Sequence, residues 1–332
     1  MTTDSPMPWQ QSFLEQHWAR VCMAWTTAID DAPAAPGALQ LAAFRERLAD
    51  RWQPDYGALA ILVAQALTAD SARLARPPLL AIAGPQGTGK STLARHLAAW
   101  TALRGGRAAV LGLDDLYLPR AARLDLAARV HPLLRTRGVP GTHDIALGMR
   151  LLDVLAAGGE DLLAAGGEDE LLLPVFDKGL DDRLEVARWQ HQRMPVDLVI
   201  IEGWCLGLPA QQPAALATAI NSLESIDDAD GRWRRWVDAQ LRSTYARFFA
   251  RFDRLLALLP PDFDAVLRWR TQQEQALPPA RRMDAPALRR FVAHYERLTR
   301  HGLLAWPARA DWCVDLAADH GIAGVHRGAA AG

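Results

Sequence analysis

The chain has 332 residues, half of them hydrophobic, which allows one large or two smaller domains with a sizeable core. Its 37 Lys and Arg residues nearly balance its 38 Asp and Glu residues, so no overall basic field points to nucleic acid. Cys22, Cys205 and Cys313 are too widely spaced to predict a disulfide framework or a zinc site, which is typical of a reducing compartment.

The chain also lacks the common targeting patterns. Its first nine residues do not contain the basic stretch followed by an apolar one that marks a secretory signal. No apolar run approaches the ~20 residues needed to span a bilayer. We therefore expect a cytoplasmic protein that binds neither nucleic acid nor membranes. Nothing in the sequence predicts its oligomeric state.

Residues 1–76 are predicted to form a helical N-terminal extension. Apolar residues recur at near-helical spacing in three segments, at 13–25, 39–48 and 56–67, with a Pro- and Gly-containing break at 32–37. The Met and Trp residues of this region indicate packing rather than a ligand site. We expect these helices to form a layer against a sheet built by residues 77–332.

The most informative stretch is 84–91, which matches the pattern G-x-x-x-x-G-K-[ST] at every fixed position. A short apolar run at 79–83 predicts a buried strand before it, and 92–100 predicts a helix after it. This arrangement aims free backbone N–H groups and the positive helix end at one anion. A glycine-rich turn that matches by chance is the alternative, and the flanking strand and helix argue against it.

We therefore predict that this loop binds a nucleoside triphosphate. Lys90 is expected to reach the outer phosphates, and the Ser91 hydroxyl is expected to ligate Mg²⁺. The predicted phosphate-binding residues are Gly84, Pro85, Gln86, Gly87, Thr88, Gly89, Lys90, Ser91 and Thr92.

A second strand, predicted at 108–113, ends in the acidic pair Asp114 and Asp115. Ligands of open α/β sheets lie beyond the carboxyl ends of the strands, so this pair is predicted to lie near the phosphates. One of the two is expected to have a capping or turn role. We expect Asp114 to be the one that faces the reaction.

Residues 118–196 form a long excursion before the next strand. Its first part carries cations among Pro and Gly residues that are typical of an exposed loop. A helix is predicted at 145–156, and the hexapeptide at 156–161 recurs at 164–169, which we interpret as a tandem duplication in a surface loop. The cations of the first part are Arg129, His131, Arg135, Arg137 and His143, for which a solvated loop is the alternative.

A third strand, predicted at 197–203, contains Glu202 near its carboxyl end. Glu202 is expected to hold Mg²⁺ directly or through water, with a chance acid at a strand end as the alternative. Fourth and fifth strands are predicted at 255–259 and 312–316. Arg268 and Arg270, on a helix between them, could close over the triphosphate or be ordinary surface arginines.

Five apolar strands separated by helices predict an α/β fold with a parallel sheet covered on both faces. The motifs together resemble the D-glycerate 3-kinase family, a branch of the P-loop kinases that includes phosphoribulokinase, uridine kinase and pantothenate kinase. The resemblance spans roughly residues 78–316. It is carried by the segments 84–91, 113–117, 131–144, 176–178, 182–183, 201–205 and 269–274.

The resemblance implies a doubly wound sheet of the P-loop NTPase type, with ATP and Mg²⁺ as the nucleotide and metal. It also implies transfer of the ATP γ-phosphoryl group to a hydroxyl of D-glycerate. In the relatives, the first aspartate after the second strand serves as the base, and Asp114 holds that position here. Lys90 and the metal would neutralise charge.

The acceptor is predicted to be a small anionic hydroxy acid, because a carboxylate needs cations and the excursion is rich in them. The predicted acceptor-binding residues are Asp115, Tyr117, His131, Arg137, His143, Lys178 and Arg183. The alternatives are a kinase for pantothenate, a nucleoside or a sugar phosphate, a nucleotide-binding scaffold without transfer, and a regulatory NTPase. A GTPase is disfavoured, because we find no Asn/Thr-Lys-x-Asp element.

Overall fold

The computed structural model describes residues 7–26, 35–157, 169–278 and 282–329. Within these ranges, a six-stranded sheet has the order β10-β9-β8-β1-β7-β2. All neighbouring strands pair in parallel except β10, which pairs antiparallel with β9. The strands are β1 (Leu79–Ala83), β2 (Ala108–Gly112), β7 (Leu198–Gly203), β8 (Arg254–Leu259), β9 (Trp312–Leu316) and β10 (Ile322–Arg327).

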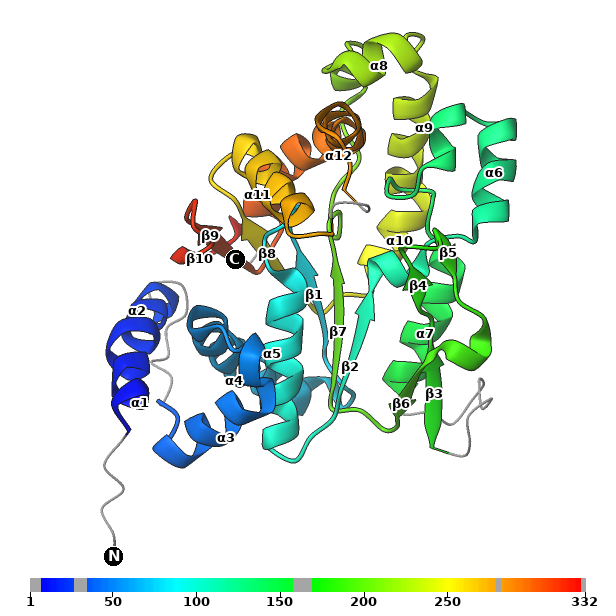
Figure 1. Ribbon diagram of the computed structural model, residues 1–332. Helices are drawn as coiled ribbons and strands as arrows, with labels where there is room; N and C mark the ends of the chain where they lie inside the picture. The colour runs from blue at the N-terminus through cyan, green and yellow to red at the C-terminus, as the bar shows by residue number, and fades with distance from the viewer. Residues whose placement is uncertain (1–6, 27–34, 158–168, 279–281, 330–332) are drawn as a thin grey trace, which may run out of the picture.

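Helices cover both faces of this sheet, which confirms the predicted α/β class (Figure 1). One face carries the N-terminal helices together with α11, and the other carries the helices of the second half of the chain. The first group is α1 (Pro8–Ser12), α2 (Ala19–Thr26), α3 (Ala38–Leu48), α4 (Pro54–Leu74), α5 (Lys90–Leu103) and α11 (Phe263–Gln275). The second group is α7 (Ile145–Ala157), α9 (Arg232–Gln240), α10 (Ala246–Phe249) and α12 (Ala285–Ala305).

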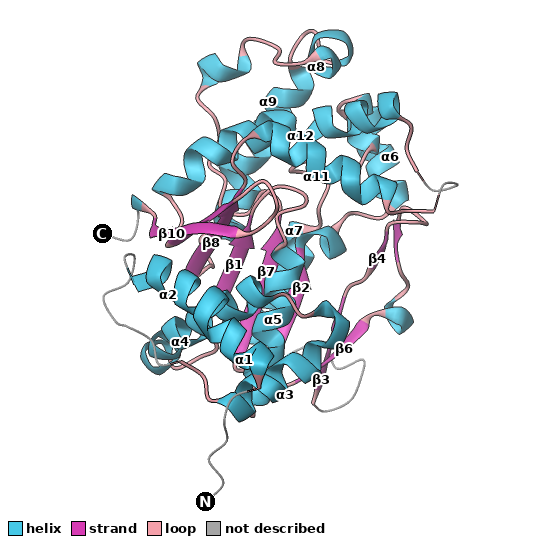
Figure 2. Cartoon of the chain, turned by 60° about the vertical axis from the view of Figure 1, so that its left-hand side comes forward, coloured by secondary structure: helices cyan, strands magenta, loops and turns pink. Residues whose placement is uncertain are grey.

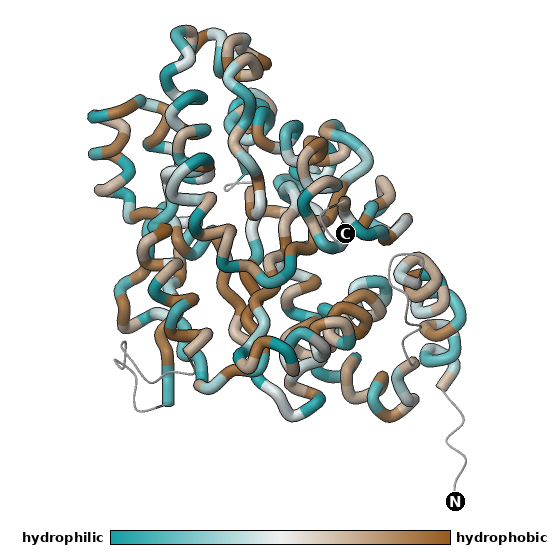
Figure 3. Tube along the Cα trace, turned by 180° about the vertical axis from the view of Figure 1, so that it is seen from behind, coloured by the Kyte–Doolittle hydropathy of each residue, from teal (hydrophilic) through white to brown (hydrophobic). Residues whose placement is uncertain are grey.

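Alternate residues of the central strands belong to two hydrophobic cores, one on each face of the sheet. In β1, Leu80 and Ile82 join the core under the N-terminal helices, whereas Ala81 and Ala83 join the opposite core. This follows from the two-residue period of a strand. The hydrophobic colouring along the strands in Figure 3 agrees with burial on both faces.

The predicted N-terminal layer is present, and it shares its core with the sheet. Trp25 and Phe44 are buried in the same cluster as Ile82 of β1 and Leu93 of α5. Residues 58–63 of α4 are almost entirely inaccessible to solvent. The described helices between residues 8 and 74 therefore pack as part of the main body. None of the described helices is both long and apolar enough to cross a membrane.

The described part of the excursion at 118–196 contains two α-helices and two small hairpins. The hairpins lie apart from the central sheet (Figure 2). Of the duplicated segment at 156–169, only Ala156, Ala157 and Asp169 fall within the described residues. The elements here are α6 (Arg120–Arg129), α7, the β3–β6 hairpin (Glu170–Leu173 and Gln190–Arg193) and the β4–β5 hairpin (Phe176–Asp177 and Asp182–Arg183). A further short helix, α8 (Ser222–Asp227), follows β7.

The edge strand β10 was not predicted from the sequence. Only Ile322 and Val325 of this edge strand are buried, and the register shifts between Ile322 and Gly324. An edge strand with an interrupted alternation gives a weak sequence signal.

Candidate active site

The loop at 84–91 connects β1 to α5, as its motif requires. Helix α5 begins at Lys90, so the loop backbone leads directly into the positive end of a helix. The φ angle is +86° at Gly87 and +82° at Gly89, values that residues with side chains rarely adopt. The glycines therefore have the conformational role that the motif predicts. Pro85 and Gln86 lie on the same loop, and Thr92 lies on the first turn of α5.

The N-terminal layer contacts this loop directly through Tyr56 of α4. The Tyr56 hydroxyl donates a 2.8 Å hydrogen bond to the carbonyl oxygen of Thr88. A Cβ added to Gly89 would lie only 2.3 Å from the same hydroxyl oxygen. This contact could not be predicted from the sequence, because one tyrosine on an apolar helix belongs to no motif.

Helix α11 also packs against the loop, through Trp269. A Cβ added to Gly87 would lie 2.8 Å from the Cβ of Trp269. The two arginines predicted to close over the phosphates are on this helix. Arg270 is paired with Glu274 at 2.7 Å, and Arg268 is half exposed. In the described part of the chain, neither is hydrogen-bonded to the loop, so their role stays a prediction.

Three predicted residues converge where β1 and β7 end. The Ser91 hydroxyl donates a 2.6 Å hydrogen bond to Oε1 of Glu202, which follows the buried part of β7. The Lys90 ammonium donates to the carbonyl oxygen of Pro85 at 2.8 Å. Burial lowers the pKa of Lys90, and the nearby carboxylates of Glu202 and Asp114 oppose that effect.

The oxygen atoms of Ser91 and Glu202 fit Mg²⁺. Mg²⁺ prefers oxygen ligands and is usually held by one or two carboxylates together with substrate phosphates. Among the described residues, no group of three or more His, Cys, Asp or Glu side chains is placed to hold a metal. Two oxygen donors of this kind leave further ligand positions of Mg²⁺ to water and substrate phosphates.

Asp114 begins the turn that follows β2, and both of its carboxylate oxygens are occupied. The Tyr117 hydroxyl donates to Oδ1 at 2.9 Å, and the Lys178 ammonium donates to Oδ2 at 2.7 Å. Burial raises the pKa of Asp114, but Lys178 and Tyr117 outweigh burial, so the pKa lies below its ordinary value. The carboxylate is therefore ionised at neutral pH.

Asp115 has the structural role expected for one of the two aspartates. Its Oδ1 accepts a 3.1 Å hydrogen bond from the backbone N–H of Phe176, which ties β4 to the end of β2. Burial raises the pKa of Asp115 to about 6, although the Phe176 amide opposes that rise. Its described hydrogen bond therefore holds the fold, and acceptor binding by Asp115 stays a prediction.

The β4–β5 hairpin brings Lys178 to Asp114, and the predicted cation Arg137 lies beside this hairpin. Lys178 lies at its tip with a side chain that is 62% exposed. Arg137 pairs with Asp181, donates to the carbonyl oxygen of Lys178 at 3.4 Å, and lies 5.4 Å from the ring centroid of Phe176. The exposed position of Lys178 means that it can move at small cost.

The Arg183 side chain is hydrogen-bonded to the backbone of the turn after β2. It donates to the carbonyl oxygens of Leu116 and Tyr117, at 3.3 and 2.8 Å, and to Asp144 at 3.2 Å. Its side chain is largely buried. Although it was predicted to bind the acceptor, its described contacts hold the segment that carries Asp114.

His143 is next to the site but is not a cation. Its ring stacks on Tyr117 at 4.5 Å between centroids, and its Nδ1 lies 2.6 Å from the Tyr245 hydroxyl. Burial lowers the pKa of His143 to about 3, so the ring is neutral at physiological pH. A positive charge on His143 therefore does not fit this position, because burial overrides its residue type, and acceptor binding by His143 stays a prediction.

His131 does not join this cluster. Its Nδ1 accepts a 3.3 Å hydrogen bond from the backbone N–H of Leu133, and its Nε2 lies 3.9 Å from Asp228. It thus begins the turn after α6 and faces the segment between α8 and α9. Its predicted role in acceptor binding is not supported by this placement, since nearness in sequence to His143 does not bring the two side chains together.

No protein-family model matches the chain. The chain is 32% identical over 235 residues to "Uncharacterized kinase mug58" of Schizosaccharomyces pombe, which covers 66% of this chain and 79% of that protein. It is 28% identical over 215 residues to "D-glycerate 3-kinase, chloroplastic" of Arabidopsis thaliana, covering 60% of this chain and 42% of that one. Among solved structures, the fold is similar to a D-glycerate 3-kinase from Cryptococcus neoformans, with a TM-score of 0.65 at 23% identity over 81% of this chain and 99% of that one.

Proposed function

The chain belongs to the D-glycerate 3-kinase family of P-loop kinases, and on that premise we propose that it transfers the γ-phosphoryl group of ATP to a hydroxyl of D-glycerate. The observation that carries the proposal is the ionised carboxylate of Asp114. Its negative charge raises the pKa of Lys90 in the phosphate loop, against the effect of burial. It is also paired with the exposed ammonium group of Lys178. A base, a phosphate site and a cation for an acid are thus adjacent.

Phosphoryl transfer needs positioning and charge neutralisation more than covalent chemistry. The backbone N–H groups of the loop and the start of α5 would hold the phosphates. Lys90 would leave the Pro85 carbonyl for an outer phosphate oxygen. Mg²⁺, held by Ser91 and Glu202, would supply further neutralisation of phosphate charge when bound.

Asp114 is the proposed general base. Tyr117 fixes one oxygen of its carboxylate, so the other oxygen must accept the proton of the acceptor hydroxyl. That oxygen is bonded to Lys178, whose exposed side chain can turn to the carboxylate of the acceptor. A positioned base typically contributes ~10²–10⁴ in rate.

The cations that remain available favour an anionic acceptor. Lys178 lies exposed at the hairpin tip, and Arg137 lies beside it but is paired with Asp181, whereas Arg183 and His131 are bonded elsewhere and His143 is neutral. A nucleoside acceptor would instead need an aromatic face for stacking. Both candidate rings are already packed, since Tyr117 stacks on His143 and Phe176 lies against Tyr117 and Arg137.

The test is an acceptor panel with ATP and Mg²⁺. D-glycerate, pantothenate, uridine and ribulose 5-phosphate are offered separately, and the phosphorylated position of any product is determined by NMR. We expect product from D-glycerate alone, and none with the Asp114→Asn variant. Phosphorylation of another acceptor without phosphorylation of D-glycerate would refute the proposal.

A further inference from the structure

His143 has one ring nitrogen that is buried without a partner. The residue is 5% exposed, and among the described residues its Nε2 atom has no hydrogen-bond partner. Leaving such an atom unpaired is unfavourable, so native proteins rarely do so without a reason. Whether Nε2 can donate or accept a hydrogen bond depends on which ring nitrogen carries the proton.

The hydrogen bonds at the Tyr245 hydroxyl locate that proton. The backbone N–H of Gly141 donates to the hydroxyl oxygen at 2.9 Å. The hydroxyl also has one proton to donate. Among the described residues, the acceptor within hydrogen-bond distance of this hydroxyl is Nδ1 of His143, 2.6 Å away, so the hydroxyl proton points to Nδ1.

Nδ1 is thus an acceptor, and the single proton of the neutral ring resides on Nε2. We propose that Tyr245 holds His143 as the neutral Nε2–H tautomer, and that this N–H binds an oxygen of the phosphoryl acceptor beside its reacting hydroxyl. The second half of this inference rests on the proposed function, since it requires an acceptor at Asp114. Tyr245 is a positioning residue, because it acts only through His143.

The position of the ring relative to Asp114 supports an acceptor oxygen as the ligand. His143 and Tyr117 are paired in an isolated antiparallel bridge, which sets their rings face to face at 4.5 Å. The Tyr117 hydroxyl in turn bonds Asp114. An N–H group can hold an oxygen but cannot accept a proton, so this assignment leaves Asp114 as the base.

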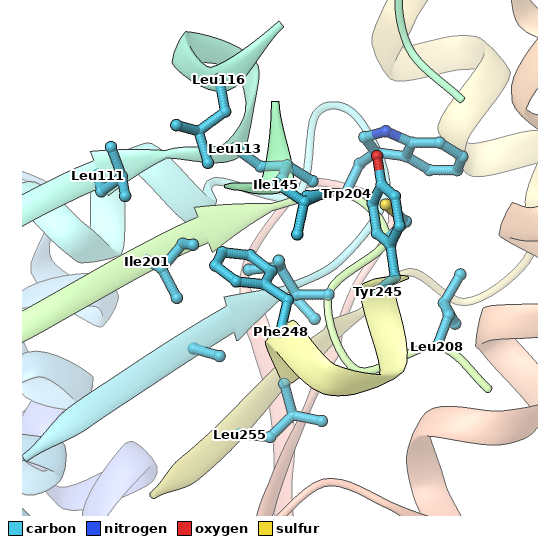
Figure 4. Close-up of a cluster of buried hydrophobic side chains, with 14 of the residues drawn as sticks. Leu111, Leu113, Leu116, Ile145, Ile201, Trp204, Leu208, Tyr245, Phe248 and Leu255 are labelled. Atoms are coloured by element: carbon cyan, nitrogen blue, oxygen red, sulfur yellow. The ribbon is translucent and has the colours of Figure 1, made fainter. Parts of the chain in front are cut away.

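Tyr245 is well placed to keep the ring fixed. It belongs, with Trp204, to the buried core on this face of the sheet (Figure 4). It is 1% exposed and packs edge-on against Phe249. A rigid hydroxyl of this kind selects one tautomer in a way that water would not.

The tautomer can be measured in the protein without ligand by long-range ¹H–¹⁵N NMR of the histidine rings. The spectrum of His143→Gln identifies the His143 signals by their loss. We expect the wild-type protein to show a proton on Nε2 and a bare Nδ1, and Tyr245→Phe to show loss of that preference. A proton on Nδ1 in the wild-type protein would overturn the inference, whatever the acceptor is.

Steady-state kinetics test the contact with the acceptor. Glutamine places an N–H group close to the position of Nε2, whereas leucine removes it. We expect His143→Leu to raise the KM for D-glycerate about tenfold, the value of one neutral hydrogen bond, with the KM for ATP unchanged. His143→Gln should retain most of the wild-type KM, and equal losses in both variants would refute the contact.

The Tyr245 hydroxyl also accepts a hydrogen bond from the backbone N–H of Gly141, so its loss could weaken the fold as well as release His143. The double variant of Tyr245→Phe with His143→Gln separates these two effects. Tyr245→Phe should raise the KM for D-glycerate in the wild-type background but not in the His143→Gln background. An equal effect in both backgrounds would show that Tyr245 does not act through His143. If the wild-type protein does not phosphorylate D-glycerate at all, the proposed function is wrong. The NMR measurement still tests the tautomer, because it is made without any acceptor.

Discussion

The ion pair between Lys178 and Asp114 gives a quantitative prediction for Lys178→Gln. Both side chains are partly exposed, at 62% and 39%, so the pair resembles a surface salt bridge, worth about 0.2–1 kcal/mol. One pKa unit corresponds to about 1.36 kcal/mol. Removing the cation should therefore raise the pKa of Asp114 by less than about one unit. A base with a raised pKa is protonated at higher pH, so activity on the acid side is lost earlier.

The same substitution should weaken the binding of an anionic acceptor. A hydrogen bond to a charged group contributes about 1.5–3 kcal/mol, which corresponds to a rise of about 10- to 150-fold in the KM for D-glycerate. Glycerol lacks the carboxylate, so any activity on it should not fall in the variant. Lys178→Arg, which keeps the charge, serves as the matched control.

The assay is the pH dependence of kcat/KM, whose acid limb reports the free enzyme's base. In wild-type protein the apparent pKa of this acid limb should lie below the ordinary pKa of an aspartate, because the pKa of Asp114 is lowered. In Lys178→Gln it should move to higher pH, and in Lys178→Arg it should stay. An acid limb that does not move, or moves to lower pH, would refute the coupling of Lys178 to the base.

Three further predictions concern the base, the loop and the core. Asp114→Asn should lower kcat/KM by ~10²–10⁴, while calorimetry finds ATP affinity retained; parallel loss of both would contradict its role. Gly89→Ala should abolish ATP binding, since φ is +82° and the new Cβ would meet the Tyr56 hydroxyl at 2.3 Å. Arg297→Met leaves the carboxylate of Glu224 buried without its 2.6 Å partner, so denaturant unfolding should show a loss of about 3–5 kcal/mol. A loss below 1 kcal/mol would show that the buried pair is not needed.

Features fixed by short-range pattern were predicted well from the sequence. The five parallel strands are short apolar runs, four of them buried on both faces and β2 on one, and the loop at 84–91 has a motif whose glycines adopt the expected φ angles. Strand order then brings Ser91 to Glu202, because β1 and β7 are neighbours. Lys178 meets Asp114 although 64 residues separate them, and both had been predicted to lie at the reaction site, Asp114 from its place at a strand end and Lys178 from its charge.

Features set by tertiary burial were not predictable in the same way. His131 and His143 look alike in sequence, yet one begins a turn near Asp228 and the other is a buried neutral ring. Tyr56 and Tyr245 each act through one hydroxyl oxygen aimed at a backbone or ring atom far away in sequence. No periodicity or spacing encodes such a contact, because it depends on how the layers pack.

The hydrogen bond from Tyr56 to the phosphate loop has a thermodynamic consequence for the N-terminal helices. Since α4 shares a core with β1 and α5 and also contacts the loop, these parts should melt together. A nucleotide at a hundred times its Kd would stabilise the native state by about 2.7 kcal/mol through linkage. That protection should extend to proteolytic sites in the N-terminal helices. Their rate of cleavage would then fall when a nucleotide binds, although these helices contribute none of the proposed catalytic residues.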